Sequence, residues 1–189
     1  MSLDDSKLAL FLLLGQGAER HLSHRADLVP AQQLLVSDTF DLSEVVPDTV
    51  HGAIQAAEAF KLFFVFERYL KDIIIDVLSQ DPAVPWWDKL PSDVRTEVES
   101  LEVAEDTKSW MALGTRDKSA LMTYPQLLRV IDVCWKPHFV DVIRDKSLIQ
   151  QARVLTHLRN AVAHMTPIPD EELGRIRQVM RDWFRMVAP

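Results

Sequence analysis

Three polar residues near the end of the chain have types and a spacing that suit acid–base chemistry on a phosphate. They are Arg159, Asn160 and His164. A histidine changes its charge near neutral pH and can therefore move a proton as a general acid or base. An arginine carries a permanent charge on a planar fork that fits a phosphate, and an asparagine can orient a ring or hold a ligand. These residues suit RNA cleavage without a metal ion, in which the arginine stabilises the charge that builds on the phosphorane.

The helix that must hold these residues is predicted over 147–164, because apolar side chains recur along it at helical spacing. Asn160 and His164 are four residues apart and share one face of that helix, whereas Arg159 lies on the adjoining strip. All three fall in its last turns, where the helix carbonyls favour a protonated imidazole. One histidine cannot readily act as acid and base on opposite sides of one phosphate, but two copies of the chain could supply one each.

The rest of the chain is predicted to form further helices, because its apolar runs are separated by proline-containing loops and none alternates as a half-buried strand does. The predicted fold is all-α, an antiparallel helical bundle with additional N-terminal helices. We divide the chain into a helical extension over 1–46 and a helical domain over 47–189. Thr123 and Gln126 predict a capping box at the start of one helix, and Pro137 is expected to end it. The predicted helices cover residues 5–20, 31–36, 48–78, 92–103, 124–136, 147–164 and 169–187.

The charge of the chain argues against one class of function. The chain has 28 acidic and 21 basic side chains, a net charge of −7. A protein that coats duplex DNA is usually basic, so nonspecific duplex binding is not expected. The balance is uneven, because residues 153–189 hold six arginines and four acids. This C-terminal region is where an anionic ligand meets the most favourable field.

Several residues that could suggest other chemistry have ordinary explanations. Cys134 is the single cysteine, so it cannot form a disulfide within the chain, and its apolar neighbours predict a buried thiol. The apolar run over 8–14 is far shorter than the ~20 residues of a membrane helix. His21 and His24 have a ligand-like spacing, but no cluster completes a metal site there. We therefore expect a cytoplasmic protein with no cofactor, no metal ion and no membrane association.

The stretch Leu158-Arg159-Asn160-Ala161-Val162-Ala163-His164, followed by Pro167 and by a last helix that opens on 170–173, resembles the signature of the HEPN superfamily. The name stands for higher eukaryotes and prokaryotes nucleotide-binding domains. The signature is an arginine, four to six residues and a histidine, often with asparagine just after the arginine. The subgroup that the sequence resembles is the HEPN domain at the end of a eukaryotic nuclear endoribonuclease of transcript surveillance. The stretch over 66–70 resembles the acidic position on an early helix of that subgroup.

The resemblance implies a bundle that dimerises through its motif helices. It also implies a metal-independent ribonuclease in members that keep the motif, often a toxin or a phage-defence protein. By position, Arg159 is the phosphate-binding arginine, Asn160 its polar neighbour and His164 the catalytic histidine, and Glu67 is a candidate partner that holds Arg159 in place. Many toxin members carry a tyrosine two residues after the histidine, to which another enzyme attaches nucleotides. Thr166 stands there in this chain, which puts that form of regulation in doubt.

Two functional hypotheses follow. The first is a homodimeric endoribonuclease that leaves a 2′,3′-cyclic phosphate, with an antitoxin as a further partner if it acts as a toxin. The second is a non-catalytic HEPN dimer that binds a nucleotide, an RNA end or a larger effector protein. A plain structural bundle also stays open, because an arginine and a histidine five residues apart occur by chance in many helices, where the histidine can simply cap the helix end.

Overall fold

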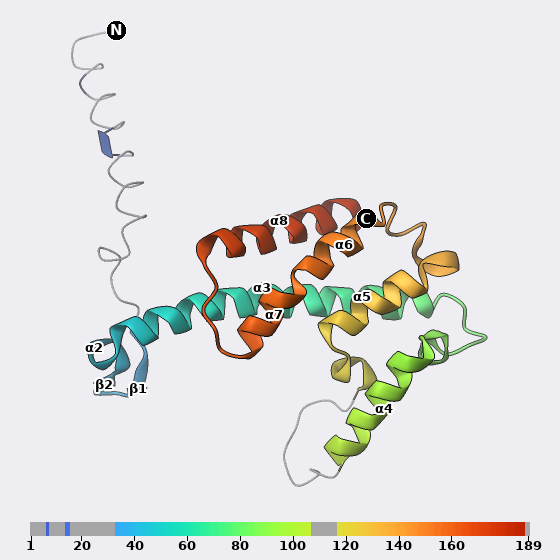
Figure 1. Cartoon of the computed structure of the whole chain (residues 1–189), viewed down its shortest axis with the longest axis horizontal. Helices are drawn as coiled ribbons and strands as arrows, with labels where there is room; N and C mark the ends of the chain where they lie inside the picture. The colour runs from blue at the N-terminus through green and yellow to red at the C-terminus, as the bar shows by residue number, and fades with distance from the viewer. Residues whose placement is uncertain (1–6, 8–13, 16–32, 107–116, 188–189) are drawn as a thin grey trace. The chain divides into compact units, whose positions relative to one another are not determined.

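The computed structural model of this 189-residue chain describes residue 7, residues 14–15, residues 33–106 and residues 117–187 (Figure 1). The chain forms two compact units, residues 1–54 and residues 55–189. Most of the helix predicted over 5–20 lies outside the described residues. The elements in chain order are β1 (Leu35–Ser37), β2 (Phe40–Asp41), α2 (Leu42–Val45), α3 (Pro47–Leu78), η1 (Trp86–Lys89), α4 (Ser92–Asp106), η2 (Lys118–Leu121), α5 (Tyr124–Val133), η3 (Trp135–Phe139), α6 (Ser147–Val154), α7 (Thr156–Ala163) and α8 (Asp170–Val187).

The first unit contains a short β-hairpin at the place where the sequence predicts a helix over 31–36. β1 and β2 are antiparallel, with Leu35 opposite Asp41. The Asp41 carboxylate accepts hydrogen bonds from the backbone N–H groups of Leu34 at 3.1 Å and Ser43 at 2.8 Å. The first of these bonds fixes the chain before the hairpin, and the second caps α2. The helix prediction was therefore wrong, because the Asp41 side chain satisfies the Leu34 N–H, which a helix over 31–36 would have paired.

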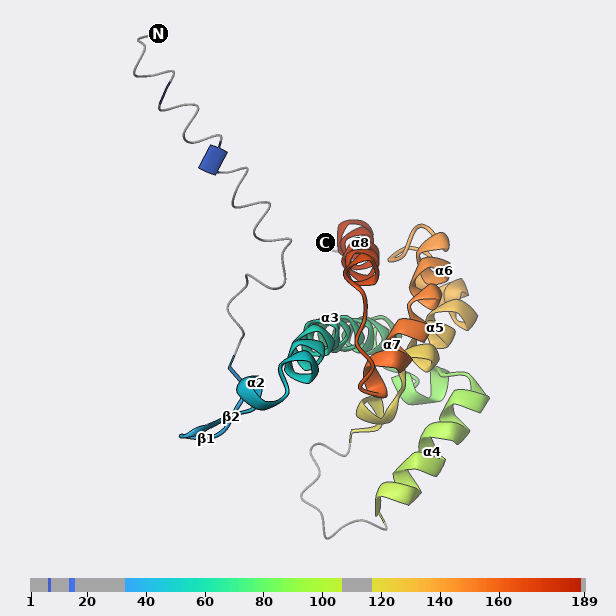
Figure 2. The same cartoon turned by 60° about the vertical axis from the view of Figure 1, so that its left-hand side comes forward.

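The all-α prediction is confirmed for the second unit, whose described residues form helices and connecting loops. Figures 1 and 2 show α8, α7 and α5 arranged along α3, with α4 towards the C-terminal end of α3. The Phe66 ring of α3 meets Trp183 of α8 with ring centres 5.6 Å apart, and Phe63 meets Tyr124 of α5 at 5.8 Å. The buried apolar positions of α3 within this unit recur at helical spacing: Ala59, Phe63, Phe66, Leu70, Ile74, Val77 and Leu78.

The N-terminal end of α5 follows the predicted capping box. The Thr123 N–H donates to Gln126 Oε1 at 2.8 Å, which satisfies a backbone donor that precedes the helix. The α-helix ends at Val133, earlier than the predicted end at Pro137, and continues as the short helix η3. Lys136 takes extended angles, φ −106° and ψ 127°, because a residue before proline is largely excluded from helical conformations.

Cys134 is buried, as the sequence predicts, and its thiol donates to the Lys89 carbonyl at 3.5 Å. Burial raises the pKa of the Cys134 thiol, which lowers the fraction of reactive thiolate. We therefore expect the folded chain at pH 8 to react with dithionitrobenzoate at least about tenfold more slowly than the chain unfolded in urea. Absorbance of the released thionitrobenzoate measures both rates, and equal rates would show that the thiol is accessible in the folded protein.

Among the residues that the structure describes, no helix has both the length and the apolar character that a membrane crossing needs.

Candidate active site at the end of α7

The helix predicted over 147–164 is in fact two helices, α6 and α7, which meet at the buried residue Leu155. The Leu155 N–H donates to the Ala152 carbonyl, three residues back, at 3.0 Å, so the turn between α6 and α7 is tighter than an α-helical one. The regular pattern resumes when the Arg159 N–H donates to the Leu155 carbonyl at 2.9 Å. The stretch contains neither proline nor glycine, the usual sequence signs of a kink, so the break could not be predicted.

Arg159 and Glu67 form an ion pair between α7 and α3. Arg159 Nε donates to Glu67 Oε1 at 2.9 Å, and the two side chains are 30% and 17% exposed. Leu155 and Val162, about one turn before and after Arg159, are buried and turn this face of α7 inwards. Within the described part of the chain, neither Nη group of Arg159 has a hydrogen-bond partner. The guanidinium is thus held at one edge and open at the two groups that bind anions.

Two further residues, Lys71 and Tyr124, lie close enough to Glu67 to feel its charge, and neither was predicted from the sequence. Lys71 lies one turn further along α3, half-buried, with Nζ donating to the Ala120 carbonyl at 3.4 Å. Burial lowers the pKa of Lys71, and the charge of Glu67 opposes that shift. Tyr124 is fully buried and donates to the Ala152 carbonyl at 2.8 Å; burial raises its pKa, and the charge of Glu67 adds to that rise. The four-residue spacing could have suggested Lys71, but no sequence pattern indicates Tyr124.

Asn160 and His164 occupy a different face of α7 from Arg159. Both side chains are exposed, and the His164 N–H donates to the Asn160 carbonyl at 3.0 Å. Five residues of helix place His164 about 140° around the axis from Arg159. Among the described residues, the side chains of Asn160 and His164 form no hydrogen bond with each other or with Arg159. Within one copy of the chain, Arg159 therefore contacts Glu67, whereas the side chains of Asn160 and His164 face outwards.

A C-terminal capping motif fixes the backbone at His164. The Thr166 N–H donates to the Ala161 carbonyl at 2.9 Å, and the Met165 N–H donates to the Val162 carbonyl at 3.0 Å. This pair of bonds is the Schellman arrangement, which requires a left-handed residue at the position after the cap. Met165 is that residue, with φ 58° and an exposed fraction of 83%. The site histidine is thus the C-cap residue that follows α7, and the residue after it has a strained backbone.

We expect Met165→Gly to raise the free energy of unfolding by about 0.5–1 kcal/mol, because glycine adopts the left-handed region without the Cβ clash. The exposed methionine side chain buries too little surface to offset this gain. Urea denaturation measures the change. Met165→Ala is the matched control and should not stabilise, since alanine keeps a Cβ; equal gains for both variants would contradict this explanation.

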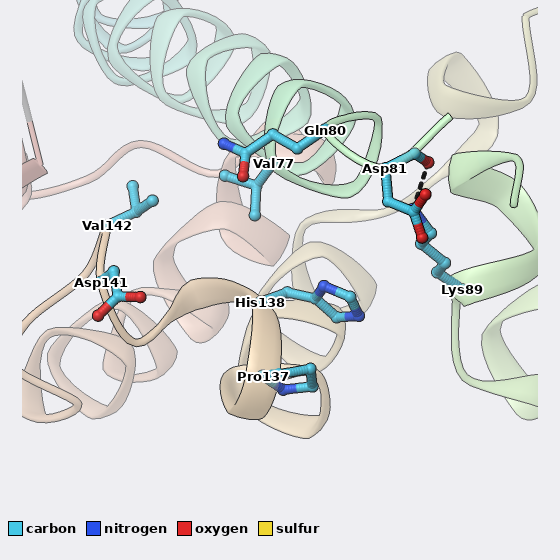
Figure 3. Close-up of a pocket in the computed structure, with 8 residues that line it drawn as sticks. All are labelled: Val77, Gln80, Asp81, Lys89, Pro137, His138, Asp141 and Val142. Atoms are coloured by element: carbon cyan, nitrogen blue, oxygen red, sulfur yellow. Dashed lines mark hydrogen bonds between the residues drawn. The ribbon is translucent and has the colours of Figure 1, made fainter. Parts of the chain in front are cut away.

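A separate cavity of about 370 Å³ lies at the C-terminal end of α3 (Figure 3). It begins ten residues beyond Glu67, roughly 15 Å of helix away, and contains none of the motif residues. The Lys89 ammonium donates to the carbonyls of Leu78 at 2.6 Å and Asp81 at 2.9 Å, so it closes the end of α3. Within the described residues, no group of three or more His, Cys, Asp or Glu side chains could hold a metal ion. Residues that line the cavity include Val77, Gln80, Asp81, Lys89, His138 and Asp141.

Comparison with protein families assigns most of this sequence to a known group. Residues 61–188 match the family model described as Swt1-like HEPN. The chain belongs to the Swt1-like HEPN family. The match to this HEPN model confirms the resemblance to the superfamily, and it includes both Glu67 and the motif over 158–164. Comparisons with curated proteins and with solved structures found no match to this HEPN chain.

Proposed function

We propose that this HEPN chain is a homodimeric endoribonuclease that cleaves RNA without a metal ion and leaves a 2′,3′-cyclic phosphate. The observation that carries the proposal is the ion pair in which the Glu67 carboxylate accepts a hydrogen bond from Arg159 Nε, so that both Nη groups are available to a phosphate. A guanidinium fixed in this way needs little reorganisation when charge builds on the phosphorane. Membership of the HEPN family supports RNA as the substrate.

In the proposed reaction, a ribose 2′-oxygen attacks the adjacent phosphorus, and the bond to the 5′-oxygen of the next nucleotide breaks. One His164 accepts the proton of the 2′-hydroxyl, and the His164 of a second copy donates a proton to the leaving 5′-oxygen. Arg159 binds the non-bridging oxygens of the phosphate, and Asn160 orients an imidazole or holds the ligand. Glu67 acts through Arg159 by fixing its orientation.

A second copy of the chain is part of the proposal because one chain presents a single, outward-facing His164. Phe60 and Phe64 lie on α3 within two turns before Glu67, are 58% and 65% exposed, and have ring centres 6.1 Å apart. Adjacent exposed aromatic rings are typical of protein–protein contacts. We propose that these rings and the end of α7 face the second copy, which brings the two His164 side chains to one phosphate.

The outward-facing positions of Asn160 and His164 also favour a second candidate function. A side chain that nothing in its own chain orients is not preorganised for catalysis. The chain would then be a HEPN dimer that binds a nucleotide, an RNA end or an effector protein without turnover. In either case we propose a role in a toxin–antitoxin pair or in phage defence, without nucleotide attachment at position 166, which is threonine.

Incubation of a labelled mixed-sequence RNA with the chain in EDTA tests the proposal. We expect cleavage products with 2′,3′-cyclic phosphate ends, and light scattering should give the mass of a dimer. An intact RNA that nevertheless binds the wild-type chain, and no longer binds Arg159→Ala, would favour the binding module. Products with 3′-hydroxyl ends, or cleavage only when a divalent metal is added, would contradict the proposed mechanism.

A further inference from the structure

Three arginines of α8 differ from most other described arginines because they form no ion pair with a carboxylate of the described residues. Arg177, Arg181 and Arg185 are exposed, and none forms an ion pair with a described residue; Arg144 is the only other described arginine in that state. Partners are not scarce, since the chain has 28 acidic and 21 basic side chains. The six ion-paired arginines are Arg68, Arg95, Arg129, Arg153, Arg159 and Arg175.

These three residues, here called the arginine row, follow one another at intervals of four. Each step advances about 6 Å along the helix and turns about 40° around it. The macrodipole does not account for the row, because its effect is confined to the last turn, and only Arg185 lies there. The pKa of Glu58 in α3 is lowered mainly by Lys61, which pairs with Glu58 at 2.7 Å, and the charge of Arg177 adds a smaller lowering.

The arginine row sits on a helix that is fixed to the same scaffold as the candidate site. Trp183 is fully buried and meets the Phe66 ring, and Phe184 meets the Tyr69 ring with ring centres 4.5 Å apart. Phe66 and Tyr69 flank Glu67 on α3. Figure 1 shows α8 lying along α3 over this length. The row and the Glu67–Arg159 pair therefore hold a fixed geometry relative to each other.

We infer that the arginine row binds the phosphate backbone of a single-stranded RNA segment that extends beyond the site at Arg159. The inference rests on the proposed function, which supplies RNA as the ligand. Guanidinium groups form strong charge-assisted bonds with phosphates, and steps of about 6 Å are on the scale that separates neighbouring phosphates of an extended strand. The acidic remainder of the chain repels RNA, which leaves this row as the favoured path. Backbone contacts position a strand without reading its sequence.

The test is the salt dependence of RNA binding. A His164→Ala background prevents turnover, and the affinity for a fluorescent mixed-sequence single-stranded RNA is measured across a range of salt concentrations. Each phosphate contact on a single strand contributes about 0.7 to the slope of log affinity against log salt. Replacing Arg177, Arg181 and Arg185 together with alanine should therefore reduce the slope by about 2. Lowering the salt from about 1 M to about 0.1 M should then strengthen binding by the parent roughly 100-fold more than binding by the variant.

The matched control removes the same number of charges from ion-paired positions, Arg95→Ala, Arg129→Ala and Arg175→Ala together. Its slope should stay within about 0.5 of the parent slope. Lysine at the three row positions should restore most of the slope, because the charge is retained. Circular dichroism melts establish that each variant is folded at the temperature of the binding assay.

The inference is overturned if the variant that lacks the arginine row keeps the parent slope, or if the control variant loses as much slope as the row variant does. It is also overturned if the row variant loses binding to anionic vesicles while its RNA affinity is unchanged. Failure of the proposed function is a different result. RNA binding that depends on the arginine row, without cleavage by the wild-type chain, would contradict the nuclease function and support the inferred role of the row. Cleavage by the wild-type chain, together with unchanged RNA binding by the row variant, would support the nuclease function and contradict the inferred role of the row.

Discussion

His164→Ala is expected to lower kcat for RNA cleavage at least about 100-fold, because general acid–base catalysis contributes about 10²–10⁴-fold. The fold should be unaffected, since the His164 side chain is exposed and forms no hydrogen bond with the described residues. Initial rates and thermal melts measure the two effects separately. His157→Ala is the matched control, because His157 is also an exposed histidine of α7. Equal rates for wild type and His164→Ala would remove the histidine from the mechanism.

Mixed dimers distinguish one histidine per phosphate from two. When wild type is refolded together with an excess of His164→Ala, most wild-type chains enter heterodimers. If both copies of His164 act on one phosphate, activity per wild-type chain should fall well below that of wild type alone. If a single histidine suffices, activity per wild-type chain should stay constant. The second result would leave the cleavage reaction in place and contradict the two-histidine assignment.

Local periodicity predicted most of the fold because it reports which face of a helix is buried. The ranges of α3, α4, α5 and α8 follow from apolar spacing and from capping residues such as Thr123. Besides the early end of α5 at Val133, two predictions were wrong for reasons that apolar spacing does not report. Asp41 satisfies backbone donors with its side chain and favours a hairpin. The break at Leu155 depends on how α6 and α7 pack, and nothing in the residue types there indicates a kink.

The candidate site was only partly predictable for a related reason. The motif over 158–164 is a local pattern, so the sequence alone indicates it. The contact between Arg159 and Glu67 joins residues 92 positions apart, and only the family resemblance suggested it. The charge of Glu67 acts on Tyr124 because α5 packs on α3, and no spacing in the sequence indicates that the two residues lie near each other. The outward orientation of His164 follows from its position about 140° around the helix axis from Arg159, which faces Glu67.

The second large effect is expected at Arg159. Arg159→Ala should lower kcat by roughly 10²–10³-fold, the range observed when one preorganised donor to a developing oxyanion is removed. Glu67→Gln should lower kcat by roughly tenfold, because a neutral amide holds the guanidinium less firmly than a carboxylate does. Stability should change by only about 1 kcal/mol or less in either variant, since Arg159 is 30% exposed and solvent screens the pair.

The double variant decides whether Glu67 acts through Arg159. If positioning Arg159 is its whole role, Glu67→Gln should have no further effect in an Arg159→Ala background, so the two losses will not add. Additive losses would instead give Glu67 an independent role, such as proton transfer. Arg153 and Asp132 provide the matched control, because they form a comparable pair at 2.6 Å with exposed fractions of 40% and 20% outside the motif. Arg153→Ala should leave kcat unchanged. That result would show that the loss of kcat is specific to the Arg159–Glu67 pair and does not follow from removing any ion pair.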